Sequence, residues 1–516
     1  MSATMIEVFN PANGEKIGET KSHNAEEARE AIKRAKKAQK HWEAIGVDER
    51  IRVIRRFKDI LLDRAEEMSE AIARENGKVL QEALEMEVFP VADLAAYFSG
   101  RVKDLLAPHK IPLHLLKHRR SYIHHRPRGV VLIISPWNFP FAIPFGTVLM
   151  SLLAGNAVIL KPASLTPLIA LKGRELFDEA GLDADLFQVI PCPGKVGSEM
   201  IHMDVDYVQF TGSTEVGRKV YETCGGLLMP CAMELGGKDP AIVLPDADLD
   251  IAAGGLVWGA FANAGQVCAA VERVYIHETI FDELCTRITE RTKQLRVGDP
   301  LLDGTDVGPM TDPSQIEIVA RQVEDAVRKG AKVHCGGKRL DGPGRFFAPT
   351  VLTDVTDDMD VIKNETFGPL LPLMKYATVD EAIERANDSS YGLDAYVFGR
   401  DARETRRVAE RLEAGTVMIN ETLITHAMPE TPWGGVKNSG VGHVHSDEGL
   451  KQLCIPYHVN EEVVPTLKKN PFWYPYSHAK YHAFVAMARA VDHGDLTAKV
   501  RGAADLVGSA WRMLRS

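Results

Sequence analysis

The sequence predicts an α/β protein with two parallel-sheet domains. Two series of short apolar segments alternate with helical stretches, the first over residues 129–211 and the second over about 241–419. This alternation is typical of βαβ units, whose parallel sheet is covered by helices on both faces. The chain has 516 residues, of which 45% are hydrophobic, and is therefore long enough for two independent cores.

The region that precedes the first series is expected to be helical. Apolar and charged residues recur with helical spacing through 25–42, 50–72 and 79–98, and the charged faces are interpreted as solvated surface. Residues 120–127 alternate in the manner of an exposed strand. Their two histidines lack the acidic or cysteine partners at ligand spacing that a metal site needs.

Each apolar run of the first series ends at a turn or a polar residue. The expected strands are 129–135, 157–160, 186–191 and 207–211, with a helix at 167–180. Sites in parallel sheets lie at the carboxyl ends of the strands, so ligand-binding residues are expected directly after these runs. The second series has expected strands at 241–244, 273–276, 332–335 and 416–419, and a helix at 280–296.

The composition excludes several classes of protein. Sixty-one basic and 71 acidic residues give a net charge of −10, which argues against nucleic acid as the main partner. The chain has seven cysteines, an odd number, and no Cys-x-x-Cys pair. Neither a disulfide framework nor a metal site is therefore expected. The N-terminus has no apolar core of signal-peptide type, and no run of about 18 uncharged apolar residues occurs. We therefore expect a cytoplasmic protein.

Cys268 is a candidate nucleophile. It lies in Asn-Ala-Gly-Gln-Val-Cys-Ala-Ala, where small neighbours leave room for a ligand beside the sulfur. The simpler alternative is a buried core cysteine. A nucleophilic role needs a base and an oxyanion donor elsewhere in the chain.

Two polar residues that follow apolar runs are candidates for those roles. Glu234 precedes Gly236 and Gly237 and is interpreted either as a salt-bridged carboxylate or as a general base that activates water. Asn138, in Ser-Pro-Trp-Asn-Phe-Pro, is either a turn former or a donor to a developing oxyanion.

The segment 210–217, Phe-Thr-Gly-Ser-Thr-Glu-Val-Gly, joins an expected strand to an expected helix. Its helix N-terminus could face a pyrophosphate, although a tight N-capped turn explains the same residues. The usual dinucleotide fingerprint Gly-x-Gly-x-x-Gly is absent, as is a Walker A loop.

Taken together and in order, these motifs resemble those of the NAD(P)-dependent aldehyde dehydrogenase superfamily, over about residues 5–462. The motifs are residues 135–140, 155–162, 210–217, 233–238, 265–268, 365–369 and 432–440. The resemblance implies the aldehyde dehydrogenase fold, with two Rossmann-like domains and a small strand extension used for oligomerisation.

The resemblance implies that Cys268 attacks the aldehyde carbonyl as a thiolate and forms a thiohemiacetal. Asn138 and the Cys268 backbone N–H hold the oxyanion, hydride passes to the nicotinamide, and Glu234 activates water to hydrolyse the thioester. A thiolate is a strong nucleophile near neutral pH, and a carboxylate suits a base that takes a proton from water. The CoA-acylating branch usually lacks this glutamate, so Glu234 indicates hydrolysis to a free acid.

The resemblance also implies the residues that bind NAD or NADP. They are Trp137, Lys161, Ser164, Gly212, Ser213, Gly217, Leu235, Gly236, Glu365 and Phe367. Of these, Lys161 contacts the adenosine ribose, Glu365 contacts the nicotinamide ribose, and the turn around Ser213 lies near the pyrophosphate. Gly434 and Gly435 are expected to shape the loop near the substrate mouth.

Two residues depart from the pattern of many members. Members that are strict for NAD often have Glu at the position of Ser164, where its charge repels a 2′-phosphate. We therefore predict that this chain accepts NADP. His443 stands where many members carry Arg, and the sequence suggests no role for it.

The expected domain organisation follows the family. Residues 1–108 and 128–236 form the dinucleotide-binding domain, 237–446 the catalytic domain, and 109–127 with 447–465 the strands that pair across subunits in a homodimer or tetramer. Residues 466–516 form a separate basic tail. It has eight Lys/Arg and three Asp/Glu, and Val500, Ala503, Val507, Trp511 and Leu514 fall on one helical stripe.

The C-terminal tail resembles the extension of a subset related to fatty and aromatic aldehyde dehydrogenases. This resemblance and the apolar residues after Asn138 predict a hydrophobic aldehyde, long-chain or aromatic, as the substrate. Succinic semialdehyde is the alternative, since Lys-Pro-Ala-Ser at 161–164 also occurs in NADP-using members of that group. An inactive structural or membrane-surface member is a further alternative, which the presence of Cys268, Glu234 and Asn138 opposes. The tail is interpreted as a helix packed on the dimer, a gate over the substrate funnel, or a peripheral membrane contact.

Overall fold

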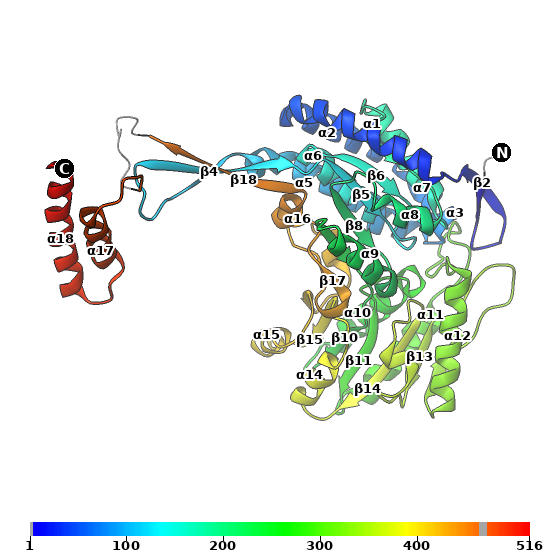
Figure 1. Ribbon diagram of the computed structural model, residues 1–516. Coiled ribbons are helices and arrows are strands. Elements are labelled where there is room, and N and C mark those ends of the chain that lie inside the picture. Colours follow the sequence, from blue (N-terminus) through cyan, green and yellow to red (C-terminus); the bar gives the residue numbers. More distant parts are fainter. Residues whose placement is uncertain (1–3, 464–471, 516) are drawn as a thin grey trace. The chain divides into compact units, whose positions relative to one another are not determined.

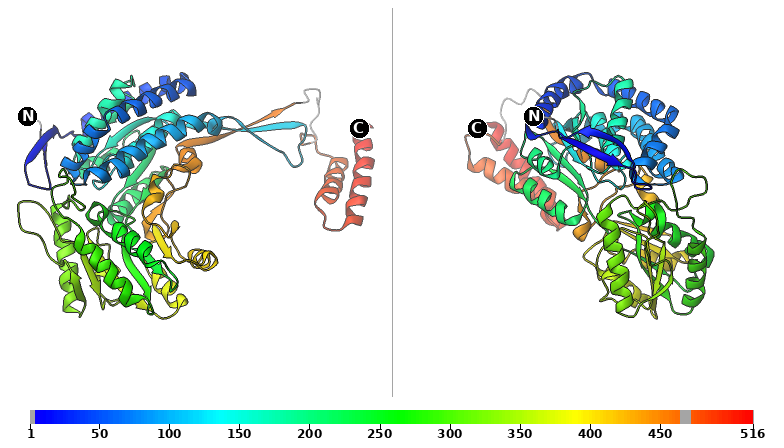
Figure 2. Two further views of the ribbon diagram at one scale, coloured as in Figure 1. Left: turned by 180° about the vertical axis from the view of Figure 1, so that it is seen from behind. Right: turned by 90° about the vertical axis from the view of Figure 1, so that its right-hand side faces the viewer.

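The computed structural model describes residues 4–463 and 472–515, with side chains through Ser509. The chain divides into two compact units: residues up to 107 with 124–457, and residues 108–123 with the part that follows 457. The larger unit contains two sheets, each with its own hydrophobic core. Figures 1 and 2 show these sheets, the first with cyan to green strands beside the blue helices, the second in green and yellow.

The first sheet has six strands in the order β17-β9-β8-β5-β6-β7. They are β17 (Gly440–Val441), β9 (Cys231–Glu234), β8 (Tyr207–Thr211), β5 (Val130–Ile134), β6 (Ala157–Lys161) and β7 (Phe187–Val189). All neighbours are parallel except β17, which is antiparallel to β9. The strands of the first series were therefore predicted correctly. Their residues are almost all buried, because helices cover both faces.

Helices α1 (Ala25–Ala44), α2 (Val47–Asp63), α3 (Ala65–Asn76), α5 (Phe89–Leu106), α6 (Ala142–Ala154), α7 (Pro167–Glu179), α8 (Gly194–Met200) and α9 (Thr214–Gly226) surround this sheet. The helix expected at 50–72 is interrupted at Arg64. The helix expected at 79–98 contains a short α4 (Leu80–Ala83) and a π-helical turn η1 (Leu84–Val88). This turn contains the buried Glu87, whose carboxylate accepts the backbone N–H groups of Phe141 and Ala142 at 2.8 Å.

The second sheet has seven strands in the order β12-β13-β14-β11-β10-β15-β16. They are β12 (Lys332–Cys335), β13 (Thr350–Thr353), β14 (Leu370–Tyr376), β11 (Val271–His277), β10 (Asp239–Val243), β15 (Asp394–Phe398) and β16 (Thr416–Ile419). Helices α10 (Leu249–Phe261), α11 (Phe281–Gln294), α12 (Pro313–Arg328), α13 (Asp360–Lys363), α14 (Val379–Asn387) and α15 (Ala402–Ala409) accompany it. The prediction missed β13, β14 and β15. It also treated 332–335 as one of a parallel series, whereas β12 is an exposed edge strand antiparallel to β13.

Smaller sheets complete the chain. The hairpin β1 (Met5–Phe9) and β2 (Lys16–Lys21) was not predicted. A three-stranded sheet has the order β18 (Cys454–Glu462), β4 (Arg119–Pro127) and β3 (His109–Ile111). The expected strand at 447–465 is shorter than predicted, because residues up to Gln452 belong to helix α16 (Ser446–Gln452).

In the tail, α17 (His478–Asp492) and α18 (Leu496–Arg515) pack together. Gly502 permits this approach, since a Cβ there would lie 2.5 Å from the backbone nitrogen of Ala490. The predicted stripe is exposed at Val500, Ala503 and Val507. The start of the tail at 466–471 and the side chains of Trp511 and Leu514 lie outside the described residues. No helix in the described part of the chain is long and apolar enough to cross a membrane.

Candidate active site

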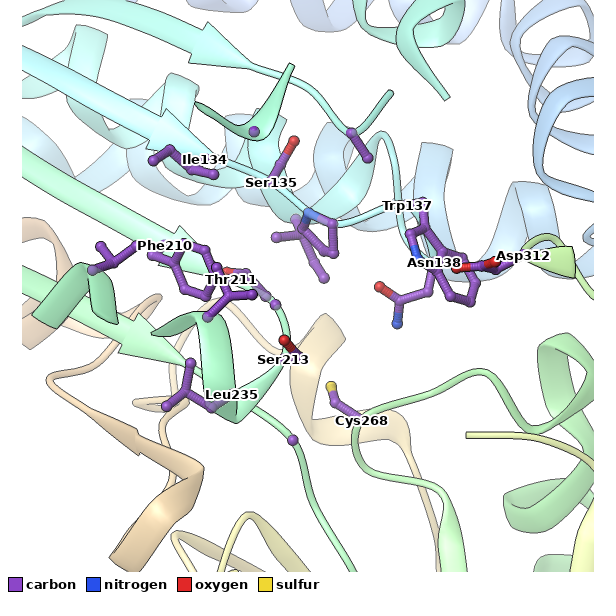
Figure 3. A pocket seen from close by; sticks show the side chains of 18 of the residues that line it. Ile134, Ser135, Trp137, Asn138, Phe210, Thr211, Ser213, Leu235, Cys268 and Asp312 are labelled. Carbon is purple, nitrogen blue, oxygen red and sulfur yellow. The ribbon is translucent and has the colours of Figure 1, made fainter. Parts of the chain in front are cut away.

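A large cavity of about 640 Å³ opens at the carboxyl ends of β5, β6 and β8, and we call it the large cavity. Most of the predicted site residues line it: Trp137, Asn138, Lys161, Ser164, Gly212, Ser213, Leu235, Gly236, Cys268, Glu365 and Phe367. Figure 3 shows this cavity with the Asn138 amide and the Cys268 sulfur facing each other across it. The convergence has a simple origin, because each strand of a parallel sheet ends at the same edge.

One end of the large cavity is formed around Lys161, the last residue of β6. Its side chain is buried beside α8, and a Cβ added to Gly197 would lie 3.5 Å from its Cδ and Cε. Burial lowers the pKa of Lys161 from its usual value. Ser164 follows in the next loop and also lines the cavity. A cation and a hydroxyl are thus available for a ribose or a phosphate.

The N-terminus of α9 faces the middle of the large cavity. Ser213 is the N-cap residue, but its side chain makes no capping hydrogen bond with the helix. The first amides of a 13-residue helix can therefore receive an anion. Gly217 does not line the cavity. A Cβ at this position would lie 2.2 Å from Leu235 Cδ2, so Gly217 allows α9 to pack closely on Leu235.

Glu365 borders the large cavity beside two glycines. Its Oε1 accepts the backbone N–H of Gly237 at 3.0 Å, and a Cβ at Gly236 would lie only 2.5 Å from its Oε2. Burial raises the pKa of Glu365 to about 8. Trp137 and Phe367 form an edge-to-face pair with ring centroids 5.4 Å apart. The residues thus fit a dinucleotide: a cation at one end, free amides in the middle, and a glycine floor with aromatic walls at the other end.

A second cavity of about 200 Å³ meets the large one at Cys268, and we call it the apolar cavity. Its lining comprises Glu85, Met86, Phe139, Ile143, Trp258, Val267, Cys268, Ala269, Leu423, Ile424, His426, Ala427 and Trp433. The charged or titratable side chains in this lining are Glu85, His426 and the thiol. Burial lowers the pKa of His426 to about 4, so its ring is neutral near pH 7.

Cys268 follows a turn in which Asn263 and Ala264 have positive φ values of 50° and 55°. Burial raises the pKa of its thiol well above the usual range, and the nearby carboxyl groups of Asp239 and Glu234 act in the same direction. The thiol is therefore protonated at neutral pH in this state of the protein. A group that removes its proton, or a cation that offsets the carboxylates, is needed to activate it.

Asn138 is held by a buried network. Its backbone carbonyl accepts from Lys78 Nζ and Asn263 Nδ2, each at 3.1 Å, and its own Nδ2 donates to the Gln266 carbonyl at 3.0 Å. Lys78 Nζ lies 2.6 Å from a carboxylate oxygen of Glu87, and both side chains are fully buried. The amide has two N–H bonds, so one of them is available to a ligand beside Cys268.

Glu234 ends β9 and lies behind the lining of the large cavity. It is 5% exposed, interacts with the Trp433 side chain and forms no ion pair with the described residues. Burial raises the pKa of Glu234 well above its usual value. A Cβ at Gly434 would lie 3.4 Å from its Oε1, so this glycine leaves space beside the carboxyl group. A buried carboxyl without a salt bridge is consistent with the general-base interpretation and not with the ion-paired alternative.

Comparisons with known proteins identify the family of the chain. The aldehyde dehydrogenase family matches residues 1–459. The NADP-dependent succinate-semialdehyde dehydrogenase of Escherichia coli K12 is 37% identical over 458 residues, which are 87% of this chain and 94% of the relative. The 4,4′-diapolycopene aldehyde oxidase of Methylomonas is 38% identical over 491 residues, which are 93% of this chain and 90% of the relative.

Solved structures give the same result. An NAD⁺ complex of an aldehyde dehydrogenase from Bacillus cereus is 33% identical, covers 89% of this chain and 94% of its own, and has a TM-score of 0.86. An NADP-dependent enzyme of E. coli reaches the same TM-score at 36% identity, covering 89% of this chain and 95% of its own. The chain belongs to the aldehyde dehydrogenase family. The predicted fold and the predicted class of enzyme, an NAD(P)-dependent aldehyde dehydrogenase, are confirmed.

The sequence did not reveal most of the apolar cavity. Trp258, Leu423 and His426 come from α10 and from the loop after β16, and no local pattern connects them. Glu87 was also missed, since charged residues in a helical pattern were interpreted as surface, and Lys78 lies between two expected helices and was given no role. No cluster of three or more metal-ligating side chains occurs among the residues with described positions.

Proposed function

We propose that this enzyme oxidises an uncharged, apolar aldehyde to the carboxylic acid, with Cys268 as the nucleophile. The observation that carries the proposal is the position of Cys268 at the junction of the two cavities. The large cavity suits a dinucleotide and the apolar cavity suits a hydrophobic aldehyde chain. Only at their junction can one atom contact both ligands.

The chain's own residues supply the acyl-transfer chemistry. After the Cys268 thiol has released its proton to water, its Sγ attacks the carbonyl carbon, while the second Asn138 N–H and the Cys268 backbone N–H bind the oxygen as it becomes negative. The network of Lys78 and Asn263 fixes the Asn138 backbone, so this donor needs no reorganisation during the step. Glu234 then takes a proton from the water that releases the acid.

NAD or NADP, when bound, supplies the hydride acceptor. Lys161 and Ser164 would hold the adenosine ribose, the first amides of α9 the pyrophosphate, and Glu365 the nicotinamide ribose. Gly236 keeps the floor open, since any side chain there would collide with Glu365. Trp137 and Phe367 would exclude water from the neighbouring wall.

The apolar cavity offers no cation to a second carboxylate. A dicarboxylic semialdehyde would bury its charged end among apolar side chains, beside a neutral His426 and near Glu85. Such burial costs several kcal/mol unless the charge is paired. The names of relatives such as the E. coli enzyme support succinic semialdehyde instead. The apolar lining is the reason that we favour a neutral substrate.

A comparison of substrates tests this preference. We expect kcat/KM for decanal or benzaldehyde to exceed that for succinic semialdehyde at least about a hundredfold, equivalent to about 2.7 kcal/mol. Formation of the reduced cofactor is measured with NAD or NADP in excess. A preference for succinic semialdehyde would contradict the neutral substrate. Absence of turnover with every aldehyde would favour the inactive alternative.

Ser164 determines whether a 2′-phosphate is tolerated. We expect Ser164→Glu to lower kcat/KM for NADP at least about tenfold, about 1.4 kcal/mol, because a carboxylate would repel the phosphate. The value for NAD should change less than about threefold. Ser164→Ala is the matched control and should keep both cofactors. An equal loss of kcat/KM with both cofactors would show that residue 164 does not distinguish the 2′-phosphate of NADP from the 2′-hydroxyl of NAD.

The domain assignment and the assembly are further proposals. The first sheet with its helices would hold the dinucleotide, the second sheet would support Cys268, and β3, β4 and β18 would pair with a second subunit in a dimer or tetramer. Light scattering of the full chain measures the mass of the assembly and so distinguishes a dimer from a tetramer.

The tail supports a proposal of peripheral membrane contact. Trp473, Tyr474 and Tyr476 are more than 60% exposed, and such side chains favour the interface between lipid and water. We expect the full chain to sediment with anionic vesicles and the variant Trp473→Ser/Tyr474→Ser to sediment at least about threefold less. Equal sedimentation of the two proteins would exclude this role for the aromatic side chains.

A further inference from the structure

Two buried acids lie side by side below the cysteine. Asp239 is the first residue of β10 and Asp394 is the first residue of β15, and these strands are parallel neighbours. The register pairs Ala241 with Tyr396, so the residues two positions earlier are also neighbours on one face of the sheet. Both aspartates are 1% exposed.

Neither acid has a cation for a partner. The Asp239 carboxyl group interacts with the backbone N–H of Asp394, and Oδ1 of Asp394 lacks a hydrogen-bond partner among the described residues. Lys238 is the nearest lysine in sequence, and its Nζ is paired with Glu272 at 2.5 Å. Arg273 donates instead to the backbone carbonyls of Lys238 and Ala386, each at 2.9 Å.

Two adjacent carboxylates in this environment are unfavourable unless they bind a proton. Burial raises the pKa of both groups well above the usual value, and the charge of Asp394 raises the pKa of Asp239 further. The small cavity beside them has a volume of about 10 Å³, about that of a single water site, so it cannot hold a larger ligand. One proton shared between the two acids satisfies an oxygen on each.

The pair is connected to the backbone that carries the cysteine. A Cβ added to Gly237 would lie 2.3 Å from the Cys268 carbonyl oxygen and 2.9 Å from Asp239 Oδ1, so both groups approach this glycine. The Tyr396 hydroxyl donates to the Ala269 carbonyl at 2.5 Å and lies 3.4 Å from Asp394 Oδ2. Asp239 and the Cys268 carbonyl thus lie on the same side of Gly237, and Asp394 is linked to the Ala269 carbonyl through Tyr396.

We propose that Asp239 and Asp394 share one proton and, together with Tyr396, act as positioning residues for the peptide groups of Cys268 and Ala269. The inference rests on the proposed role of Cys268, whose backbone N–H must point at the oxyanion. The other titratable or charged groups that influence or face this cluster are Glu234, Lys238, Glu272, Arg273, Glu365, Tyr391 and Glu413. They come from five different parts of the chain, and none of them forms an ion pair with the two aspartates.

Asparagine at position 394 is the matched test of a shared proton. The variant Asp394→Asn keeps the size of the side chain and replaces the shared O–H by an amide N–H that donates to Asp239. It also keeps the net charge of the pair at −1, as in a pair that holds one proton. Asp394→Ala removes both the donor and the acceptor. Tyr396→Phe removes only the hydroxyl that contacts the Ala269 carbonyl.

The first measurement is an infrared difference spectrum, full-length wild type minus Asp394→Asn, at pH 7. We expect a band of one protonated carboxyl group to be present in the wild type and lost in the variant. Other buried acids contribute equally to both proteins and cancel. Persistence of this carboxyl signal in Asp394→Asn would overturn the shared proton. The readout needs no turnover, so it stands even if Cys268 is not the nucleophile.

The second measurement is steady-state kinetics with a saturating aldehyde. We expect Asp394→Asn to keep kcat within about threefold, and Asp394→Ala and Tyr396→Phe to lower kcat at least about tenfold, with an unchanged KM for the cofactor. A rise in KM for the cofactor would overturn the positioning role. Equal losses of kcat in Asp394→Asn and Asp394→Ala would also overturn it. Failure of the proposed function has another signature, namely activity that survives Cys268→Ala.

Discussion

Cys268→Ala is expected to lower the rate of aldehyde oxidation at least about a thousandfold. The reason is geometric as well as chemical, because Cys268 and Ile143 line both cavities and, of these two, only the cysteine carries a nucleophile. No other cysteine of the chain lines either cavity, so none can substitute for it. The measurement is formation of reduced nicotinamide under saturating aldehyde and cofactor.

Cys335→Ala is the matched control. Cys335 is a half-buried free thiol at the end of the edge strand β12, and it lines neither cavity. This variant should retain full activity. Binding of the cofactor to Cys268→Ala, monitored by quenching of the intrinsic tryptophan fluorescence, should also persist. Substantial oxidation by Cys268→Ala would disprove the thiolate mechanism, because the substrate would then react without a covalent intermediate.

Much of the large cavity could be predicted because its residues follow strands. Asn138, Lys161 and Ser213 each stand in the first few residues after an apolar run, and a parallel sheet brings such positions together. Gly217 was less well placed. It lies close to Gly212 in sequence, but one turn of α9 carries it behind Leu235, so proximity along the chain did not give proximity to the cavity.

Other features depend on burial that a sequence does not display. Strand β15 begins with Asp394, a charged residue in a fully buried strand, and β14 contains Pro372, so neither resembles an ordinary apolar strand. Glu87 was assigned to the surface because charged residues at helical spacing are usually exposed, and Lys78, which lies between two expected helices, was given no role. The π-helical turn and the amides at the start of α6 place them inside instead. The apolar cavity joins residues more than 300 positions apart, which only the tertiary structure brings together.

Glu234→Gln is expected to separate the two halves of the reaction. Formation of the acyl-enzyme needs Cys268 and Asn138, whereas its hydrolysis needs a base for water. We expect one equivalent of reduced cofactor per site in a rapid burst, followed by turnover that is about a hundredfold to a thousandfold slower than that of the wild type. Rapid mixing with absorbance detection measures both phases. Glu85→Gln, at the apolar cavity, is the matched control and should turn over normally.

The pH dependence follows from the burial of Glu234. Its pKa is raised, so the carboxyl group is neutral at low pH and becomes the required carboxylate only as the pH increases. If hydrolysis limits the rate, kcat of the wild type should therefore rise with pH across the neutral range. The residual kcat of Glu234→Gln should lack this increase, since the amide does not titrate. An identical pH profile in both proteins would assign the base to another group.

The burst also distinguishes the general base from a residue that only supports the fold. If Glu234 merely stabilised the junction of β9 and β17, the glutamine variant would lose the burst and the steady rate together. If it activates water, the acyl group remains on Cys268 after the burst. A nucleophile such as hydroxylamine attacks a thioester without needing a base. Adding it should therefore raise the steady-state turnover of Glu234→Gln at least about tenfold. Failure of hydroxylamine to restore turnover after a full burst would mean that product release, and not water activation, depends on Glu234.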